Sequence, residues 1–220
     1  MVLEIDNIEL YFKNKRILNG IYLRAETGKI TSILGRNGSG KSCLINIAFG
    51  TLKAKYCNIR IDKKPLIKKL YLTKRAAFLP QFHYTPNHSK IISIFKLFNV
   101  KWNNFIENFP EFSNLKHSKF NELSGGQRRI IEIYLILKKT SEIIFLDEPF
   151  SNISPLYIEK IKSLLEIEKK QKVIILTDHN YEVVIDISDD IYLLKNGCTK
   201  LIKEIIELEQ YNYLSIGSFS

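Results

Sequence analysis

Apolar and polar residues alternate along the first part of the chain, in VLEIDNIEL and again in RILNGIYLRAE. A period of two is typical of β-strands that turn every second side chain toward a core. The continuous apolar run in KITSILG predicts a short buried strand, and a helical pattern follows from about Lys41 to Phe49. Residues 56–80 hold shorter alternating runs, NIRID and LYLTKRAAFLP, interrupted by Lys-Lys-Pro, and we expect a small β arm there.

Residues 82–120 lack strand-like patterns and are dense in aromatic and Asn residues. Ile91, Ile94, Phe95 and Phe98 recur at helical spacing. This spacing predicts a small helical subdomain inserted into the fold.

The second half of the chain alternates helical and strand patterns. We expect a helix over 123–139, a strand at EIIFLD, a helix over 155–170, a strand at KVIILTD, the segment DDIYLLKNG and a last helix, LIKEIIELEQ. Such alternation with continuous apolar strands is typical of a mostly parallel sheet covered on both faces.

The predicted fold class is therefore α/β, with a mostly parallel core sheet, an antiparallel β subdomain and a short inserted helical subdomain. The expected division of the chain is an α/β core at 1–81 and 121–210, with the β arm at about 56–80, a helical subdomain at 82–120 and a tail at 211–220.

Composition narrows the class of protein without identifying it. Of the 220 residues, 45% are hydrophobic and 25% are charged, as in an ordinary globular protein. The three cysteines are widely spaced, which favours reduced thiols over a metal site. No apolar run approaches the roughly 18 residues that a membrane span needs. We expect a soluble chain, or one attached to a membrane through another protein.

The net charge of +10 comes from 33 Lys and Arg residues that are scattered through the chain. Scattered charge favours a solvated surface over an anionic membrane surface or an acidic partner, and it favours nucleic acid least. We therefore expect no nucleic-acid partner.

The segment GRNGSGKS fits the pattern G-x-x-x-x-G-K-[ST] and lies between a predicted strand and a predicted helix. Its glycines let the backbone wrap around phosphate oxygens, so that several N–H groups converge at the start of the helix. Lys41 can then neutralise the β- and γ-phosphates, and the Ser42 hydroxyl can bind Mg²⁺. The residues expected to bind the nucleotide here are Gly35, Arg36, Asn37, Gly38, Ser39, Gly40, Lys41, Ser42 and Cys43.

Two adjacent carboxylates, Asp147 and Glu148, follow the apolar residues IIFL. This order places them at the carboxyl end of a buried strand, where open α/β sheets bind ligands. Adjacent side chains point in different directions, so we expect different roles. Asp147 would hold Mg²⁺, and Glu148 would orient and deprotonate an attacking water molecule.

A second glycine stretch, LSGGQRR from Leu123 to Arg129, precedes the apolar run IIEIYLIL. It reads as a cap and loop at the start of a helix, where backbone N–H groups and the helix dipole can hold an anion. The chain thus has two candidate anion sites.

With these motifs in order, residues 2–205 closely resemble the ATPase subunits of ABC transporters, whose own signature is LSGGQ. The resemblance implies a P-loop NTPase fold of the ABC-ATPase type, with ATP and Mg²⁺ bound. It also implies a head-to-tail dimer, either a homodimer or a heterodimer, in which each LSGGQ loop caps the ATP of the other subunit. The residues that make this contact would be Ser124, Gly125, Gly126 and Gln127.

Three further roles follow from the resemblance. Phe12, or its neighbour Tyr11, matches the aromatic residue that stacks on adenine. Gln81 matches the glutamine that touches Mg²⁺ and the attacking water, and His179 matches the histidine that bonds the γ-phosphate.

The chain also departs from the family pattern. Ser154 stands where an aspartate normally bonds across the dimer, which puts coupling between the two sites in doubt. Cys43 replaces a threonine, and Tyr134 and Leu135 occupy positions that are usually small or basic. The helical subdomain, which docks the membrane subunit in the family, is short.

We expect an ATPase that powers transport through a separate transmembrane permease from the cytoplasmic face of the membrane. Phe95, Phe98, Trp102 and Phe105 are candidate apolar anchors for the permease, although packing inside the subdomain is the favoured interpretation. The alternatives are a soluble ABC ATPase outside transport and a regulatory ATP-binding subunit with weak hydrolysis.

Overall fold

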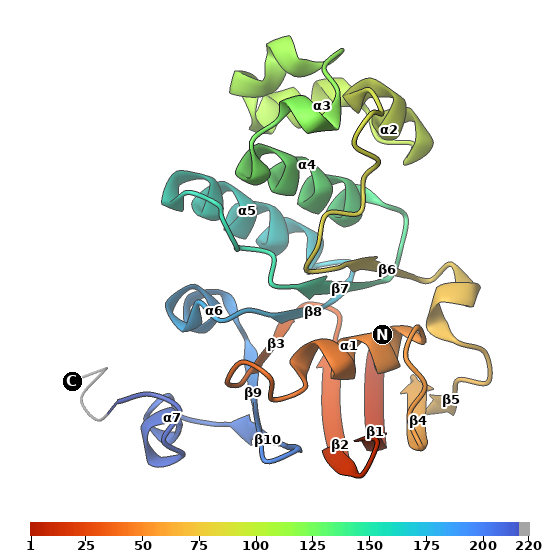
Figure 1. Cartoon of the computed structure of the whole chain (residues 1–220), viewed down its shortest axis with the longest axis vertical. Coiled ribbons are helices and arrows are strands. Elements are labelled where there is room, and N and C mark those ends of the chain that lie inside the picture. The colour runs from red at the N-terminus through yellow and green to blue at the C-terminus, as the bar shows by residue number, and fades with distance from the viewer. Residues whose placement is uncertain (216–220) are drawn as a thin grey trace.

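The computed structural model describes residues 1–215 of the chain. Within them the strands form two sheets, one of four strands in the order β2-β1-β4-β5 and one of six in the order β10-β9-β3-β8-β7-β6. Figure 1 shows the layers in sequence: a group of short helices, then α4 and α5, the six-stranded sheet, α1, and the four-stranded sheet.

The four-stranded sheet is antiparallel and begins with a long hairpin. Its strands are β1 (Val2–Phe12), β2 (Lys15–Glu26), β4 (Tyr56–Ile61) and β5 (Lys64–Pro65). The predicted alternation is confirmed, because Leu3, Ile5, Ile8 and Leu10 are buried beneath it.

The six-stranded sheet is parallel except for its edge strand β10, which pairs antiparallel with β9. Its strands are β3 (Ile30–Leu34), β6 (Ala76–Leu79), β7 (Ile143–Asp147), β8 (Val173–Thr177), β9 (Asp190–Lys195) and β10 (Cys198–Ile202). Strands β3, β7 and β8 are buried at every position, as the continuous apolar runs predict. The predicted α/β fold class is confirmed.

Helices cover both faces of this sheet (Figure 1). The α-helices are α1 (Lys41–Phe49), α2 (Ile91–Leu97), α3 (Trp102–Asn108), α4 (Gly125–Lys138), α5 (Pro155–Glu168), α6 (Tyr181–Ile187) and α7 (Ile206–Gln210). Short 3₁₀ turns lie at η1 (Leu70–Thr73), η2 (Pro110–Leu115) and η3 (Phe120–Glu122). Helix α1 packs in one apolar cluster with β1 and β2, whereas α4, α5 and α6 pack in another.

Three sequence predictions need correction. The β arm ends at β5, because β6 belongs to the six-stranded sheet and pairs parallel with β7. Helix α6 was not predicted. The last helix begins at Ile206 rather than near residue 201, since β10 occupies Cys198–Ile202. The Asn196-Gly197 turn, with φ values of 52° and 79°, is a hairpin signal that could have revealed β10.

The four candidate permease anchors pack inside the molecule, so the favoured interpretation is confirmed and the alternative of apolar anchors for the permease is ruled out. Phe95 and Phe105 are fully buried, Trp102 is 6% exposed, and Phe98 is partly buried against the same cluster. The Phe95 ring lies 5.0 Å from Trp102 and 5.3 Å from Phe105, in tilted and edge contacts. These aromatic rings form the core of the short-helix region.

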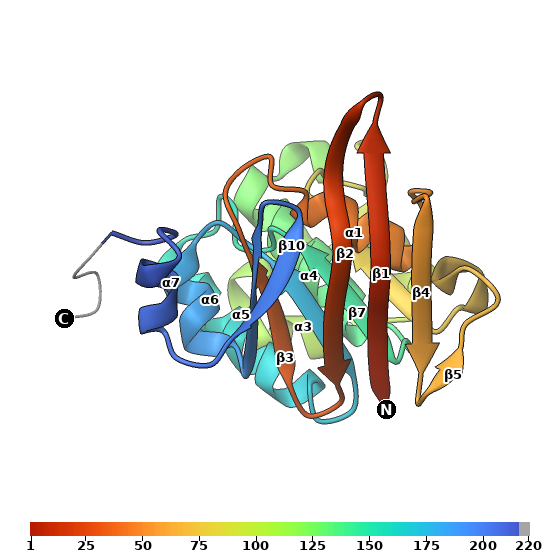
Figure 2. The same cartoon turned by 90° about the horizontal axis from the view of Figure 1, so that it is seen from below.

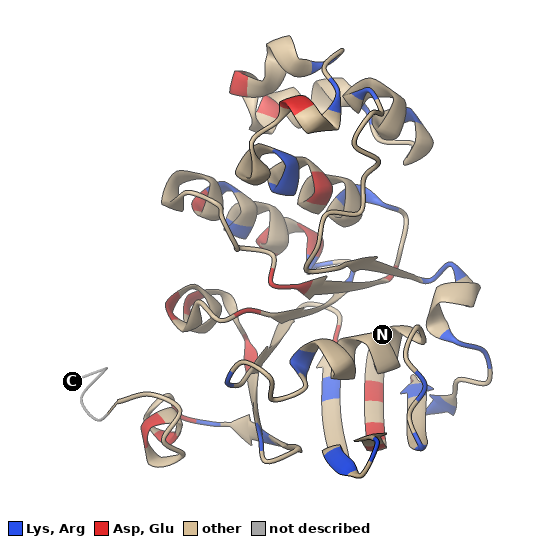
Figure 3. Ribbon diagram, viewed as in Figure 1, with Lys and Arg blue, Asp and Glu red and all other residues tan. Residues whose placement is uncertain are grey.

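The two sheets meet beside the first hairpin. Figure 2 shows β10 alongside β2, and there the backbone N–H of Tyr22 donates to Thr199 Oγ1 at 3.0 Å. Lys and Arg residues occur in every layer, as expected from their scatter along the sequence (Figure 3). Among the helices of residues 1–215, none combines the length and apolar character needed to cross a membrane.

Candidate functional site

Residues Gly35 to Ser42, the phosphate loop, join β3 to α1. Gly38 and Gly40 have φ values of 77° and 106°, a region that residues with a side chain rarely adopt. A Cβ atom on Gly40 would also lie 3.0 Å from the Leu18 side chain and 3.1 Å from that of Ile17. The loop therefore requires glycine here both for its conformation and for its packing.

The interior of the phosphate loop holds a buried cation and an unpaired hydroxyl group. Lys41 is 5% exposed, and its Nζ donates to the carbonyl oxygens of Gly35 at 2.7 Å and Arg36 at 3.4 Å. Burial lowers the pKa of Lys41, against the charge of nearby carboxylates. The buried Ser39 Oγ has no hydrogen-bond partner among residues 1–215. Both groups suit a bound phosphate.

Asp147 connects the carboxyl end of β7 to the start of α1. Its Oδ1 accepts hydrogen bonds from Ser42 Oγ at 3.1 Å and Thr177 Oγ1 at 2.7 Å. Burial raises the pKa of Asp147, although both of these hydrogen bonds act to lower it. A hydroxyl and a carboxylate side by side are the oxygen ligands that Mg²⁺ takes together with phosphate oxygens, so this pair fits that ion.

Strand register brings Glu148, Gln81 and His179 together. Leu79 pairs with Leu146 and Asp147 pairs with Thr177, so the residues that follow β6, β7 and β8 lie at one edge of the sheet. Gln81 Nε2 donates to Glu148 Oε2 at 2.8 Å. His179 Nδ1 lies 3.6 Å from the same oxygen.

These side chains face one cavity of about 270 Å³ beside the phosphate loop. The cavity is lined by Asn37, Gly38, Lys41, Ser42, Gln81, Glu148 and His179. All seven are site residues that the sequence predicted, and they lie at the ends of four different strands. The arrangement places a phosphate cradle next to a carboxylate that can accept a proton.

The second glycine stretch lies elsewhere. Ser124 caps α4, and its Oγ accepts from the Gln127 N–H at 3.2 Å while Gln127 Oε1 accepts from the Ser124 N–H at 3.0 Å. Ser124 and Gly125 are exposed, and none of residues 124–127 lines the cavity described above. Figure 1 places α4 and α1 on opposite faces of the six-stranded sheet.

The two candidates for the adenine-stacking residue, Tyr11 and Phe12, differ in their contacts. The Tyr11 hydroxyl donates to Glu9 Oε2 at 3.3 Å, and Lys55 Nζ lies 5.4 Å from the Tyr11 ring. Phe12 is 50% exposed at the end of β1. Neither residue lines the larger cavity of about 570 Å³ that runs from β2 along the phosphate loop.

The wall of that larger cavity includes a segment that the sequence did not suggest. Residues 211–213 lie against the phosphate loop, where Arg36 Nη2 donates to the Asn212 carbonyl oxygen at 3.0 Å. Burial raises the pKa of Tyr213, against a hydrogen bond from the Gly35 backbone. The tail has no periodic pattern that could have predicted this contact, and its residues 216–220 lie outside the described part of the chain.

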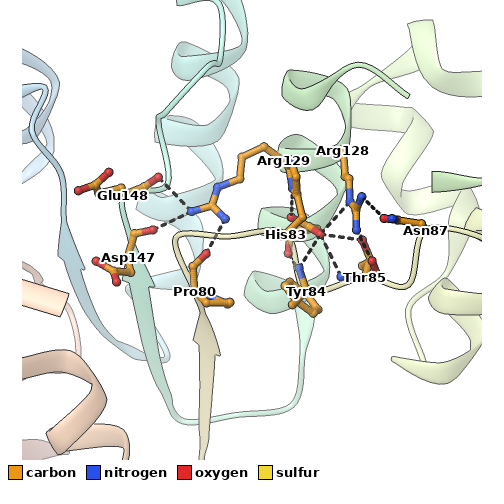
Figure 4. A network of polar contacts seen from close by, with 10 residues as sticks. Pro80, His83, Tyr84, Thr85, Asn87, Arg128, Arg129, Asp147 and Glu148 are labelled. Carbon is orange, nitrogen blue, oxygen red and sulfur yellow. Dashed lines mark hydrogen bonds and ion pairs between the residues drawn. The ribbon is translucent and has the colours of Figure 1, made fainter. Parts of the chain in front are cut away.

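Cys43 and Ser154, where the chain departs from the family pattern, do not line the cavity beside the phosphate loop. Burial raises the pKa of the half-buried Cys43 thiol, so the thiol is the group present at neutral pH. Ser154 is the N-cap residue of α5, but its side chain accepts no hydrogen bond from the first turn of the helix. Sequence reasoning missed two buried residues of α4. They are Arg129, whose contacts are shown in Figure 4, and Glu132, which bonds to Thr85.

Similarity to known proteins agrees with this geometry. A sequence profile described as ABC transporter matches residues 18–151. A probable branched-chain amino acid transport ATP-binding protein, LivG, from Methanocaldococcus jannaschii is 28% identical over 223 residues, covering 89% of this chain and 87% of the relative. The lipopolysaccharide export system ATP-binding protein LptB of Escherichia coli is 27% identical over 208 residues, covering 87% and 86%.

The same similarity extends to solved structures. A crystal structure of a nucleotide-free ATP-binding cassette from an ABC transporter superimposes with a TM-score of 0.77 at 25% identity, covering 97% of this chain and 96% of that one.

Proposed function

The chain belongs to the ABC transporter family, and from this premise we propose that it binds and hydrolyses MgATP to drive transport through a separate membrane permease. The observation that carries the proposal is one cavity in which a buried lysine, the Ser42 hydroxyl group and the Gln81–Glu148–His179 group meet, with Asp147 bonded to Ser42 behind it. A phosphate-binding loop alone would support only nucleotide binding. The neighbouring carboxylate supports hydrolysis as well.

The phosphate loop holds the β- and γ-phosphates of ATP in this proposal. Lys41 exchanges its bonds to the Gly35 and Arg36 carbonyl oxygens for bonds to phosphate, which repays the cost of burying its charge. Backbone N–H groups and the α1 N-terminus contribute partial positive charge. No acidic residue lies in the first turn of α1 to oppose the anion.

Mg²⁺ would be held by Ser42 and Asp147, with Gln81 nearby. When bound, the ion supplies charge neutralisation of the β- and γ-phosphate oxygens. Thr177 keeps the Asp147 carboxylate oriented through its 2.7 Å hydrogen bond.

Glu148 is the proposed general base. It accepts the proton of the water that attacks the γ-phosphorus, and the phosphorus–oxygen bond to ADP breaks as the new one forms. Gln81 orients the carboxylate and the water through its bond to Oε2. His179, close to the same oxygen, is placed to donate to a γ-phosphate oxygen.

The start of α4 acts on a second subunit. The N–H groups of Gly125 and Gly126 lie in the first turn of α4, away from the cavity of their own chain. Residues 124–127 are therefore proposed to cap the nucleotide held by a partner in a head-to-tail dimer. Ser154 lies near this interface in the family and lacks the charge of the usual aspartate. Coupling between the two sites would therefore be weaker, without a loss of binding.

Phe12 is the proposed adenine-stacking residue. Tyr11 is held by Glu9 and Lys55, whereas Phe12 keeps half of its surface exposed. A phenyl ring stacks on any purine, so base selectivity should be modest.

The permease contact is proposed to involve residues 82–120, which we treat as the helical subdomain beside a core at 1–81 and 121–210. Since the interior aromatics cannot serve, the exposed Phe82 and Leu97, at 79% and 76%, are better candidates. Phe82 directly follows Gln81, so contact there could reach the site. Such docking would hold the chain at the cytoplasmic face of a membrane.

Replacement of Glu148 by Gln tests the hydrolytic role. The variant should bind MgATP as the wild type does and accumulate as a nucleotide-bound dimer, while turnover falls about a hundredfold or more because the amide cannot accept the proton. Size-exclusion chromatography with ATP and a phosphate-release assay measure both effects. Glu142→Gln is the matched control, because Glu142 lies at the other end of β7 and pairs with Arg75.

Undiminished turnover in Glu148→Gln would remove the general-base assignment. Solitary protomers that retain ATP in this variant would remove the proposed composite site.

A further inference from the structure

The Arg129 guanidinium group is buried among main-chain carbonyl groups (Figure 4). The residue is 2% exposed, and its Nη1 donates to the Pro80 carbonyl oxygen at 2.7 Å. Its Nη2 donates to the carbonyl oxygens of Asp147 at 2.7 Å and Glu148 at 3.0 Å. A buried cation is costly unless hydrogen bonds replace water. Here those bonds join the ends of β6 and β7.

Glu132 is fully buried and binds the loop that follows β6. Its Oε1 accepts from Thr85 Oγ1 at 2.6 Å and from the N–H groups of Tyr84 and Thr85 at 3.2 Å each. Its Oε2 lies 2.8 Å from His83 Nδ1, and Arg128 Nε lies 3.4 Å from Oε1. Removal of the carboxylate would leave several buried donors unpaired.

The two attachments bracket Gln81. The main chain is held at residue 80 by Arg129 and at residues 84 and 85 by Glu132, which lies three positions further along the same face of α4. Glu148, which Gln81 contacts, has a φ of 49°, a strained value for a residue with a side chain. Arg129 binds the carbonyl group of that strained residue.

We propose that Arg129 and Glu132 are positioning residues that fix Gln81 and Glu148 relative to each other from α4. The inference rests on the hydrolysis proposed above, and neither residue touches the substrate. Because α4 is one continuous helix from Gly125 to Lys138, a shift at its start carries both residues with it. When residues 124–127 of one chain contact a partner's nucleotide, the contact is thereby linked to Gln81 and Glu148 of the chain that contributes α4.

Alanine and glutamine variants of Glu132 test the inference with MgATP and the purified full chain. Glu132→Ala should lower kcat about tenfold or more, with the Kd for ATP nearly unchanged, because the phosphate loop is intact while the water is misplaced. Glu132→Gln keeps an oxygen for Thr85 and Tyr84, so its kcat should recover to within about threefold of wild type. Amide hydrogen exchange over residues 80–87 should speed up in the alanine variant only.

Glu168→Ala is the matched control. Glu168 pairs with Lys138 on the last turn of α4 at 2.7 Å and with Lys172 at 2.6 Å, so its loss disturbs the same helix at the far end. The kcat of Glu168→Ala should stay within about twofold of wild type, while its loss of thermal stability should be comparable to that of Glu132→Ala.

Thr85→Val provides a second variant that keeps the shape of the side chain and loses the 2.6 Å bond. It should lower kcat about threefold, with an unchanged Kd for ATP. If Glu132→Ala and Thr85→Val both match Glu168→Ala in kcat while the wild type turns over ATP, the inference is overturned and the proposed function stands. A wild-type chain that binds ATP without turnover, even at dimer-forming concentrations, would overturn both.

Discussion

The chain contains two helix starts rich in glycine, and they differ in what surrounds them. The α1 start carries the buried Lys41 and is flanked by residues at the ends of neighbouring strands, among them the buried Asp147. The α4 start is exposed, and the side chains of Ser124 and Gln127 bond only to each other's backbone. Both offer N–H groups to an anion, but only at the first do a lysine and a carboxylate line one cavity together with the loop.

An anion site is therefore defined more by the side chains around it than by its glycine loop. The α1 start can bind a phosphate group without help. The capping residues of α4, Ser124 and Gln127, carry no charge. The α4 start therefore needs an anion that another binding site already holds. A second copy, or a related subunit, provides that ligand in the proposed dimer. The experiments below act on one start at a time.

Loss of the Lys41 charge should have the largest effect. Lys41→Ala removes the buried ammonium group from the phosphate loop, and ATP affinity should fall about a hundredfold, or about 2.7 kcal/mol. Isothermal titration with MgATP measures this change. Lys29→Ala is the control, because Lys29 precedes β3 at the opposite edge of the sheet and pairs with Glu26. Equal affinity for both variants would mean that the α1 start is not the primary nucleotide site.

A negative charge at the α4 start should separate binding from hydrolysis. Gly125 is exposed, and a Cβ atom there meets nothing within 4 Å. Gly125→Glu should keep or slightly raise protomer stability, because a carboxylate favours a helix N-terminus. It should repel the partner's γ-phosphate and lower ATP turnover about tenfold or more.

The readouts for Gly125→Glu are the Kd for MgATP at low protein concentration and kcat at high concentration. Gly125→Ala adds only a methyl group and serves as the control for lost glycine flexibility. A Gly125→Glu variant with full kcat and full dimer formation would show that the α4 start faces solvent during turnover.

The sequence predicted the residues at the start of α1 in far more detail than the distant residues that hold this site in place. Local order sufficed for Gly35–Ser42 and for the acids after β7, since strand, loop and helix are consecutive. Arg129 contacts Pro80, 49 positions away, and Glu132 contacts Tyr84, 48 positions away. No local sequence pattern predicts such contacts. The same holds for the tail segment 211–213 against the phosphate loop.

The errors in the fold prediction have related causes. An apolar segment after the Asn196-Gly197 turn was assigned to a helix although β10 is an edge strand of mixed polarity. Helical spacing also left open whether the aromatic residues of α2 and α3 face the interior or a partner, because it does not reveal which face is covered. Tertiary packing determined both outcomes.

The smallest expected effect tests whether the α4 start is held within its own chain. A Cβ atom on Gly126 would lie 2.7 Å from the Asn152 carbonyl oxygen, whereas one on Gly125 has open space. Alanine in place of a helical glycine normally stabilises by about 0.5–1 kcal/mol. Gly125→Ala should therefore raise the free energy of unfolding.

Gly126→Ala must displace the loop that carries Asn152, four residues after Glu148, and should lower stability by about 1 kcal/mol. Denaturant titration of the two variants measures the sign of each change. If Gly126→Ala also lowers kcat while the Kd for ATP is kept, the start of α4 is coupled to Glu148 through this loop as well as through Arg129. Equal stabilisation by both alanines would contradict this prediction. It would mean that the start of α4 makes no contact with the loop that carries Asn152.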